Sequence, residues 1–388
     1  MSGRVHVDIR AAAALSCFGA DRAGHVSALR EGRTGLLPNG SDGYGEAGQR
    51  AAVIPWNDTS PQRPFTLVDQ LAQQLISQAG LTADERKTIG VYVGTTTGIA
   101  ASEELAYFQQ GGLAQGNAWT LLCGGPGRLT AHLATRLGSS GPQATYTTAC
   151  TSTAVALIMA MHALRAGSIQ RAVVFGLDVL MRISMQGFRL LKLYAPTLCR
   201  PFDRDHNGLQ MGEAAAGVVL EVRSGERRRR FEVLDGAVAH DPGHIAAGSS
   251  DGAAAAQVMH RALERAGLKI SDVTAIKAHG TGTQVNDLGE LRGLERVFGT
   301  SAPPFASLKG AFGHTLGAST ALELTAWLWA LEEGFIPGSV GFANPSSGSP
   351  LTPLAAPLLT SGRPGIHLFN SFGFGGTSTS FLVEDHGA

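Results

Sequence analysis

The sequence predicts a layered α/β fold, and two observations support this class. Short runs rich in apolar and β-branched residues alternate along the chain with longer stretches of helical periodicity. Glycine accounts for 51 of the 388 residues, about 13% where ~7% is usual. Much of this glycine lies between the apolar runs, where tight turns are expected. Such alternation is typical of helices packed against a sheet.

The elements of the first half follow from these patterns. Residues 67–80 have helical periodicity and end at Gly80, a residue suited to a helix C-terminus. The stretch TYTTACTSTAVALIMAMHALRAG, 145–167, predicts a strand, a sharp turn and a helix that is apolar on nearly every face. A helix of that kind is usually buried in the middle of a protein. Buried strands are predicted at 89–98, 171–179 and 214–222.

The second half continues the alternation. It predicts helices at 253–267 and 319–334, a strand running into a glycine turn at 273–283, and two closing strands at 365–385. No internal repeat is evident in the residues themselves. The polar stretch RSGERRRRFE, 223–232, separates the two series. We therefore expect one half over 1–223 and another over 224–388, with arginines 227–230 in a solvated loop rather than an acidic-partner site.

The composition excludes several classes of protein. Lys and Arg together number 31, as do Asp and Glu, so no nucleic-acid or membrane partner is expected. No stretch reaches the ~18 uncharged apolar residues of a membrane helix. The short apolar run near the N-terminus does not suggest a leader peptide. The four cysteines form no CxxC pair, which favours a reducing, cytoplasmic location. His240 and His244 are separated by Pro242, so no metal site is expected there.

Cys150 is the central candidate for chemistry. It lies where the predicted buried helix begins, so the helix dipole and free N–H groups should favour its thiolate and lower its pKa. A strand, a sharp turn, a cysteine and a helix can hold a nucleophile over a site. By itself, however, this pattern favours an inert buried cysteine.

Three downstream stretches change that interpretation. KAHGTGTQVNDLGE places His279 at a strand end before a glycine turn. SLKGAFGHTLGAS places Lys309 five residues before His314, again among glycines. NSFGFGGTST is a glycine-rich loop whose backbone N–H groups could face an oxyanion. Two histidines at such turns, with a helix-initiating cysteine, indicate a cysteine–histidine–histidine site.

The motifs as a set resemble those of the β-ketoacyl synthases of the thiolase superfamily, in particular the synthases that elongate chains on acyl carrier protein. The motifs are TACTST, RPFDRDHNGLQMGEAAAGVVLE, HGTGTQVNDLGE, KGAFGHTLGAS and NSFGFGGT, and they stand in the family's order and near-family spacing from about residue 94 to 385. The resemblance implies a thiolase-like, duplicated five-layer αβαβα sandwich that is normally dimeric.

The resemblance also implies an activity. Cys150 would receive an acyl chain from a phosphopantetheine thioester, and His279 and His314 would stabilise the enolate formed when a malonyl thioester loses carbon dioxide. Attack of that enolate on the acyl group would give 3-oxoacyl-acyl carrier protein. Donation to a developing enolate oxygen is chemistry suited to a neutral imidazole whose ring is fixed by a neighbour.

Further roles follow from matching positions in the family. Lys309, paired with Glu323, would balance the charge around His314. Backbone N–H groups of Cys150 and Phe374 match the oxyanion hole, and Phe374 also matches a gating phenylalanine. Thr281 and Thr283 match the threonines that hold the pantetheine arm. The acidic residues that match supporting positions are Asp287 and Glu290.

The implied partners are acyl carrier protein, docked near Arg200 and Arg204, and a second ketosynthase-like subunit in a homodimer or heterodimer. No cofactor and no metal are implied beyond the carrier's own arm. Ser378 stands where the family usually has asparagine, and the N-terminus lacks the family's usual glycine-rich opening. Acyl-chain length therefore stays open, as does the choice between fatty acid synthesis and a specialised polyketide or polyene route.

Three alternatives compete with this interpretation. A degradative thiolase would need a second cysteine in the C-terminal glycine-rich loop, where none occurs. The chain-initiating synthases carry asparagine at the position of His314. A non-catalytic, chain-length-setting subunit of a heterodimeric ketosynthase would share the fold but usually lacks the cysteine, and this last alternative stays open.

Overall fold

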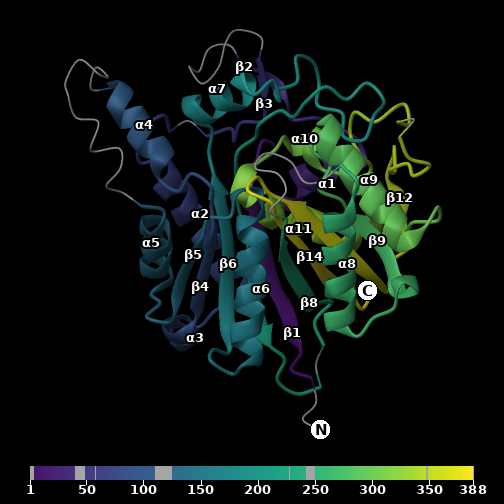
Figure 1. Ribbon diagram of the computed structural model, residues 1–388. Coiled ribbons are helices and arrows are strands. Elements are labelled where there is room, and N and C mark those ends of the chain that lie inside the picture. Colours follow the sequence, from purple (N-terminus) through teal and green to yellow (C-terminus); the bar gives the residue numbers. More distant parts are fainter. Residues whose placement is uncertain are drawn as a thin grey trace.

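Two series of strands join into one sheet. The computed structural model describes residues 4–39, 49–56, 58–109, 125–226, 228–241, 250–346 and 348–387. Within these ranges, ten strands form a mixed sheet in the order β10-β9-β13-β14-β8-β1-β7-β6-β4-β5 (Figure 1). Their bounds are β1 Val7–Leu15, β4 Gly90–Gly94, β5 Gln143–Tyr146, β6 Arg171–Asp178, β7 Ala214–Val222, β8 Phe231–His240, β9 Val273–Lys277, β10 Phe305–Ala306, β13 Gly365–Phe372 and β14 Thr377–Asp385.

The two five-stranded halves of this sheet have the same topology. In each half the first strand pairs antiparallel with the last, and the last pairs antiparallel with the fourth. The fourth strand then pairs parallel with the second, and the second pairs parallel with the third. The halves meet between β1 and β8, at the pair Asp8 and Glu232. The fold is therefore duplicated, although the sequence shows no obvious repeat.

Five layers result from the packing of helices on both faces of each half. One apolar cluster joins α2 (Arg63–Ala79) and α5 (Gly127–Leu137) to the first half. A second joins α6 (Ser152–Arg165) and α11 (Ser319–Glu332) to strands of both halves. A third joins α8 (Ala253–Ala266) and α9 (Gln284–Phe298) to the second half. Figure 1 shows this succession of helices and strands, which confirms the αβαβα sandwich.

The side chains of β6 explain why this strand is apolar throughout. Val173 and Phe175 belong to the cluster with α2 and α5, whereas Val174 belongs to the cluster with α6 and α11. Successive side chains point to opposite faces of a sheet, and here both faces are covered. The all-round apolar character of α6 and α11 has the same cause, because both lie in the central layer.

Most predicted elements occur within a few residues of their expected bounds. The predicted strand 89–98 is shorter, because residues after Gly94 turn around the buried carboxylate of Asp178. That carboxylate accepts the Thr96 and Thr97 backbone N–H groups at 3.0 and 2.9 Å. The remaining elements are α1 Arg22–Arg30, α3 Ala83–Thr88, α4 Ala100–Gln109, α7 Arg182–Leu190, α10 Lys309–Phe312, and the short pairs β2 Leu37–Asn39 with β3 Gln49–Ala51 and β11 Phe335–Ile336 with β12 Leu358–Leu359.

The joint between the halves lies between Val222 and Phe231. Arg229 pairs there with Glu221 at 2.7 Å, and Arg230 pairs with Asp385 at 2.9 Å. These two arginines therefore bind strands of both halves instead of being free in a solvated loop, while residue 227 lies outside the described ranges. We propose residues 1–223 and 224–388 as the two units.

Across the described residues, none of the helices is long and apolar enough to cross a membrane.

Candidate active site

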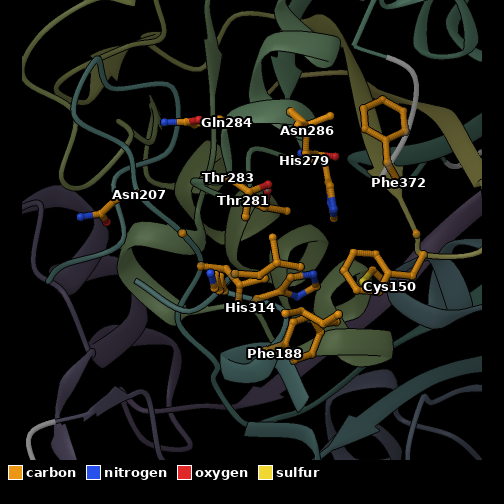
Figure 2. A pocket seen from close by; sticks show the side chains of 18 residues that line it. Cys150, Phe188, Asn207, His279, Thr281, Thr283, Gln284, Asn286, His314 and Phe372 are labelled. Carbon is orange, nitrogen blue, oxygen red and sulfur yellow. Dashed lines mark hydrogen bonds between the residues drawn. The ribbon is translucent and has the colours of Figure 1, made fainter. Parts of the chain in front are cut away.

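A cavity of about 480 Å³ opens where the two halves come together. It is lined by Cys150, His279, Thr281, His314 and Phe374, together with side chains that follow α7. Figure 2 shows the cysteine and the two histidines facing this one space. The cavity thus collects residues that are more than a hundred positions apart in the chain.

Cys150 is placed by a turn of unusual backbone conformation. A short 3-10 turn, residues 149–151, is separated from the end of β5 by two residues and leads directly into α6. Ala149 has φ +51°, a left-handed conformation that non-glycine residues seldom adopt. The Ser371 hydroxyl on β13 donates to the Cys150 carbonyl at 3.0 Å and ties this turn to the second half. The predicted strand, sharp turn and helix around the cysteine are confirmed.

The electrostatics of the thiol differ from the expectation. Burial raises the pKa of Cys150 to about 11, although the Lys309 ammonium and the Phe374 backbone N–H act in the opposite direction. The expectation of a lowered pKa is therefore wrong. Desolvation of the thiolate outweighs the favourable end of the helix, because the side chain is only 6% exposed.

His279 lies at the end of the strand β9, two residues after its last member. Its ring contacts that of Phe372 edge-on, with centroids 5.7 Å apart, and that of His314, with centroids 5.5 Å apart. Its Nδ1 has no hydrogen-bond partner among the described residues. Burial, followed by the charge of Lys309, holds the pKa of His279 well below its usual range, so the imidazole is neutral.

His314 is held in one tautomer by the turn before α11. Its Nδ1 accepts the Leu316 backbone N–H at 3.1 Å and lies 3.2 Å from the Ser319 hydroxyl. Because Nδ1 accepts a hydrogen bond, the proton of the neutral ring belongs on Nε2. Burial and then the charges of Lys309 and Lys277 hold the pKa of His314 well below its usual range. The ring is therefore a neutral donor, which suits it to an oxyanion.

Beside the histidines lies a fully buried group of charges. Glu323 of α11 binds the Lys309 ammonium through Oε1 at 2.7 Å and the Lys277 ammonium through Oε2 at 2.5 Å. The Lys309–Glu323 pair matches the sequence-based expectation. Lys277 was missed, because a lysine at the end of a strand is usually exposed. The signal was its position in VTAIK, directly after a buried apolar run.

Two buried carboxylates shape the loop that carries His279. Glu290 accepts the backbone N–H groups of His279 and Gly280, both at 2.8 Å. Asp287 accepts the backbone N–H of Thr281 at 2.9 Å. Neither carboxylate lines the main cavity. Their contacts suit the supporting role expected for Asp287 and Glu290.

The polar wall of the cavity contains the two expected threonines. The hydroxyls of Thr281 and Thr283 lie 2.8 Å apart, and both residues line the cavity. The Phe374 ring contacts that of Phe188, which the sequence alone did not single out, with centroids 5.5 Å apart. The Phe374 backbone N–H acts on the Cys150 thiol, where it lowers the pKa against the effect of burial.

Other residues named from the sequence lie outside the cavity lining. Ser378 lines a small neighbouring cavity together with Glu290. Arg204 is exposed, and Arg200 lies close enough to Asp203 to contribute to the lowered pKa of that carboxyl, which burial opposes. Position 244 falls outside the described residues, so the AHDPGH pattern is not placed. Over the described part of the chain, one group of possible metal ligands occurs, away from this lining: Glu232, Glu384 and His386.

Comparison with known proteins independently supports the resemblance that the sequence motifs indicate. Residues 57–225 match the family described as "Beta-ketoacyl synthase, N-terminal domain", and residues 230–343 match "Beta-ketoacyl synthase, C-terminal domain". Nodulation protein E of Rhizobium meliloti is 30% identical over 319 residues, covering 79% of this chain and 78% of the relative. The 3-oxoacyl-[acyl-carrier-protein] synthase 2 of Rhizobium meliloti (strain 1021) is 34% identical over 277 residues, covering 67% of this chain and 65% of the relative.

A solved structure resembles the whole chain. "The ishigamide ketosynthase/chain length factor" superimposes with a TM-score of 0.87 at 27% identity, covering 99% of this chain and 100% of the other. The similarity extends beyond the active-site motifs to nearly every element of both halves.

Proposed function

The chain belongs to the β-ketoacyl synthase family, and from this premise we propose that it catalyses the decarboxylative condensation of a Cys150-bound acyl group with malonyl-acyl carrier protein. The product is a 3-oxoacyl-acyl carrier protein. The observation that carries this proposal is the meeting of Cys150, His279 and His314 in one cavity, with His314 held as an Nε2–H donor.

In the first half-reaction the Cys150 sulfur attacks the carbonyl of an acyl thioester. The sulfur–carbon bond of the incoming thioester breaks, and the pantetheine thiol leaves with the proton of the cysteine. The backbone N–H groups of Cys150 and Phe374 stabilise the negative oxygen of the tetrahedral intermediate. Donors aimed at developing charge of this kind are the usual source of rate enhancement in acyl transfer.

In the second half-reaction a malonyl thioester enters between Cys150 and the two imidazoles. Its bond to the carboxylate breaks, carbon dioxide leaves, and the electron pair becomes an enolate whose oxygen accepts hydrogen bonds from His279 and His314. The enolate carbon then attacks the acyl carbonyl, and the bond to the Cys150 sulfur breaks. Neutral imidazoles that carry a ring proton can donate in this step, and the lowered pKa values of both rings keep them neutral.

The substrates are presented by a carrier protein, and Thr281 and Thr283 hydrogen-bond the pantetheine arm in the cavity wall. The reaction takes no electron or group from a cofactor, because the thioesters supply both the electrophile and the leaving carboxylate. A second ketosynthase-like subunit completes the enzyme. The similar ishigamide structure is named as a ketosynthase with a chain length factor, and this pairing supports a partner subunit for the present chain.

A non-catalytic, chain-length-setting role is the alternative function. The same ishigamide structure favours it, because its name includes a chain length factor as well as a ketosynthase. The nucleophile, both histidines and the Lys309–Glu323 pair are all present in this chain. Their joint presence favours the condensing role.

The decisive experiment is intact-protein mass spectrometry after incubation with acyl carrier protein thioesters of several chain lengths. We expect an acyl adduct on the wild type and none on Cys150→Ala. The lengths that react would define the starter preference. If no adduct forms with any carrier thioester, even with a ketosynthase-like partner added, the non-catalytic role replaces our proposal.

A second experiment separates acylation of Cys150 from decarboxylation of the malonyl thioester. His279→Ala and His314→Ala are each expected to keep the Cys150 adduct but to lose malonyl decarboxylation about 10²–10³-fold. The measurement is release of labelled carbon dioxide from malonyl-acyl carrier protein. Decarboxylation at the wild-type rate in either variant would contradict the assigned role of that histidine.

A further inference from the structure

The backbone carbonyl of Ala149, directly before Cys150, is held by more donors than a turn requires. The Ser152 backbone N–H donates to it, as expected of a 3-10 turn. The Ser152 hydroxyl also donates to it at 2.6 Å, and the Thr96 hydroxyl does so at 3.3 Å. Ser152 is completely buried, whereas Thr96 is exposed. Two side chains from different parts of the first half therefore fix the direction of one carbonyl.

The Ser152 hydroxyl is itself held in one orientation. Its oxygen accepts the Thr148 backbone N–H at 3.0 Å, and its single proton is donated to the Ala149 carbonyl. The side chain thus bridges two consecutive residues of the turn. Ala149 has φ +51°, and backbone of this kind persists only where the surrounding structure determines it. The bridge made by Ser152 is one such determinant.

The Thr96 hydroxyl is placed by the buried Asp178 at the end of β6. The carboxylate accepts the Thr96 backbone N–H at 3.0 Å and the hydroxyls of Thr95 and Thr97 at 2.9 and 2.7 Å. These hydrogen bonds fix the turn that follows β4. The Thr96 hydroxyl then connects this turn to the one that carries Cys150.

The Ala149 carbonyl belongs to the same peptide group as the Cys150 N–H. In a planar trans peptide these two bonds point in opposite directions, so whatever fixes the carbonyl also aims the N–H. The Cys150 nitrogen lies beside the cavity wall at Gly373, where an added Cβ atom would be 3.4 Å from it. Glycine at position 373 leaves this space free.

We propose that Ser152 is a positioning residue for acyl transfer, whose hydroxyl holds the Ala149 carbonyl and thereby aims the Cys150 N–H at the oxygen of the incoming thioester. Thr96 supports the same carbonyl from the turn after β4. This inference rests on the proposed function, because the direction of the N–H matters only if a thioester carbonyl binds there. Ser152 lies outside the cavity lining, so it acts through the peptide group and not on substrate.

The test compares two reactions of the Cys150 thiol in Ser152→Ala at the same pH. Acyl transfer from a thioester passes through an oxyanion, whereas iodoacetamide alkylates the sulfur at a saturated carbon and forms none. Loss of a whole oxyanion donor typically costs ~10²–10³-fold. Because the Ser152 backbone N–H still holds the carbonyl, we expect acylation to slow only about tenfold. Alkylation depends on the thiolate and should stay within about twofold of the wild type.

Both rates are followed by intact-protein mass spectrometry. The acyl donors are carrier protein thioesters and, as a small probe, the hexanoyl thioester of N-acetylcysteamine. The small probe reports on the oxyanion hole without requiring a carrier protein to dock.

A second variant tests the same carbonyl at an exposed position. Thr96→Val removes the longer of the two hydroxyl bonds, so it should slow acylation about threefold, and Thr96→Ser keeps the hydroxyl and should react as the wild type does. The matched control is Thr135→Val. The exposed Thr135 donates to the Ala131 carbonyl at 2.9 Å within α5, so its loss should leave both rates unchanged.

The outcomes separate this inference from the proposed function. A wild-type acylation rate in Ser152→Ala, or in Thr96→Val where Ser152→Ala does not fold, would overturn the positioning role and leave the proposed function standing. Equal slowing of acylation and alkylation would place the defect in the thiol and also overturn that role. If only the small thioester acylates the protein, and Ser152→Ala slows it, the proposed function fails while the positioning role stands. If no thioester acylates the wild type, both fail.

Discussion

At the scale of single residues, Cys150 lines the cavity of the candidate site while its thiol stays protonated. Burial raises the pKa of its thiol to about 11, even though the Phe374 N–H and the Lys309 ammonium are arranged to stabilise a thiolate. The thiolate, not the thiol, is the nucleophile. In the proposed acylation the proton therefore leaves as the thioester arrives, and the pantetheine sulfur released in that step is a base of suitable strength.

A direct consequence is the pH dependence of alkylation. Below its pKa, the thiolate fraction of Cys150 rises about tenfold per pH unit. We expect its iodoacetamide modification rate, followed by peptide mass spectrometry, to climb steadily from pH 7 to 9.5 without a plateau. Burial raises the pKa of Cys199 to about 12, so the peptide of Cys199 should react more slowly still. A plateau of the Cys150 rate near pH 8 would contradict a raised pKa.

The sequence could predict which residues meet at the candidate site but not the electrostatic environment of those residues. His279, His314 and Lys309 lie in short glycine-flanked stretches, where a polar side chain in a tight turn already suggests chemistry. Lys277 could not be assigned in that way, because its partner Glu323 is 46 residues away and the shared carboxylate is visible only in three dimensions. The pKa of Cys150 likewise depends on how distant segments cover it.

At the scale of elements, the turn before α6 has a counterpart before α11. Thr148 to Ala154 reads TACTSTA and Thr315 to Ala321 reads TLGASTA. Each segment forms a 3-10 turn leading into a central helix, with φ +51° at Ala149 and +50° at Leu316. The sequence therefore does carry a short trace of the duplication, although no internal repeat is evident along the chain. The shared pattern is too short to stand out until the matching topology aligns it.

This strained turn can be tested at Ala149. Left-handed backbone is hardest for β-branched side chains, so Ala149→Val should lower the stability of the protein by ~1–3 kcal/mol. It should also slow acylation of Cys150, because the cysteine moves with the turn. Ala149→Gly fits the same backbone without strain, so its melting temperature should equal or exceed that of the wild type. The measurements are thermal unfolding and the intact-mass assay, and a Val variant as stable as the Gly variant would argue against strain.

At the scale of the whole molecule, the sequence predicted the class of fold better than the order of the strands in the sheet. Helices such as α11 and strands such as β7 follow from local periodicity, and their bounds needed little correction. The strand order did not follow, because β8 lies beside β1 across more than two hundred residues. Such pairings depend on side chains that meet only in the folded protein. The side chain of Arg223 is one example.

Arg223 joins the two halves at the point where their sheets meet. Its guanidinium binds Asp8 of β1 at 2.5 Å and Glu232 of β8 at 2.6 Å, and all three side chains are buried. Arg223→Met would leave two buried carboxylates without this partner. Removing one member of a buried ionic group typically costs ~3–5 kcal/mol, so we expect the melting temperature at pH 7 to fall by ~5 °C. Arg33→Met, which disrupts an exposed pair with Glu31, should change it by less than ~1 °C.

The drop in melting temperature caused by Arg223→Met should depend on pH in a defined direction. Burial alone would raise the pKa of Glu232, but hydrogen bonds from His6 and Arg223 hold it below its ordinary value. A lowered pKa in the folded state adds stability that is present above the unfolded pKa of ~4.3 and is lost as the pH falls through the folded value. Arg223→Met lacks part of this stabilisation, so its melting temperature should differ most from the wild type above pH 5 and approach it only as the pH falls below about 4. A difference that does not shrink between pH 7 and about pH 3.5 in differential scanning fluorimetry would mean that Arg223 joins the halves by packing, not by charge.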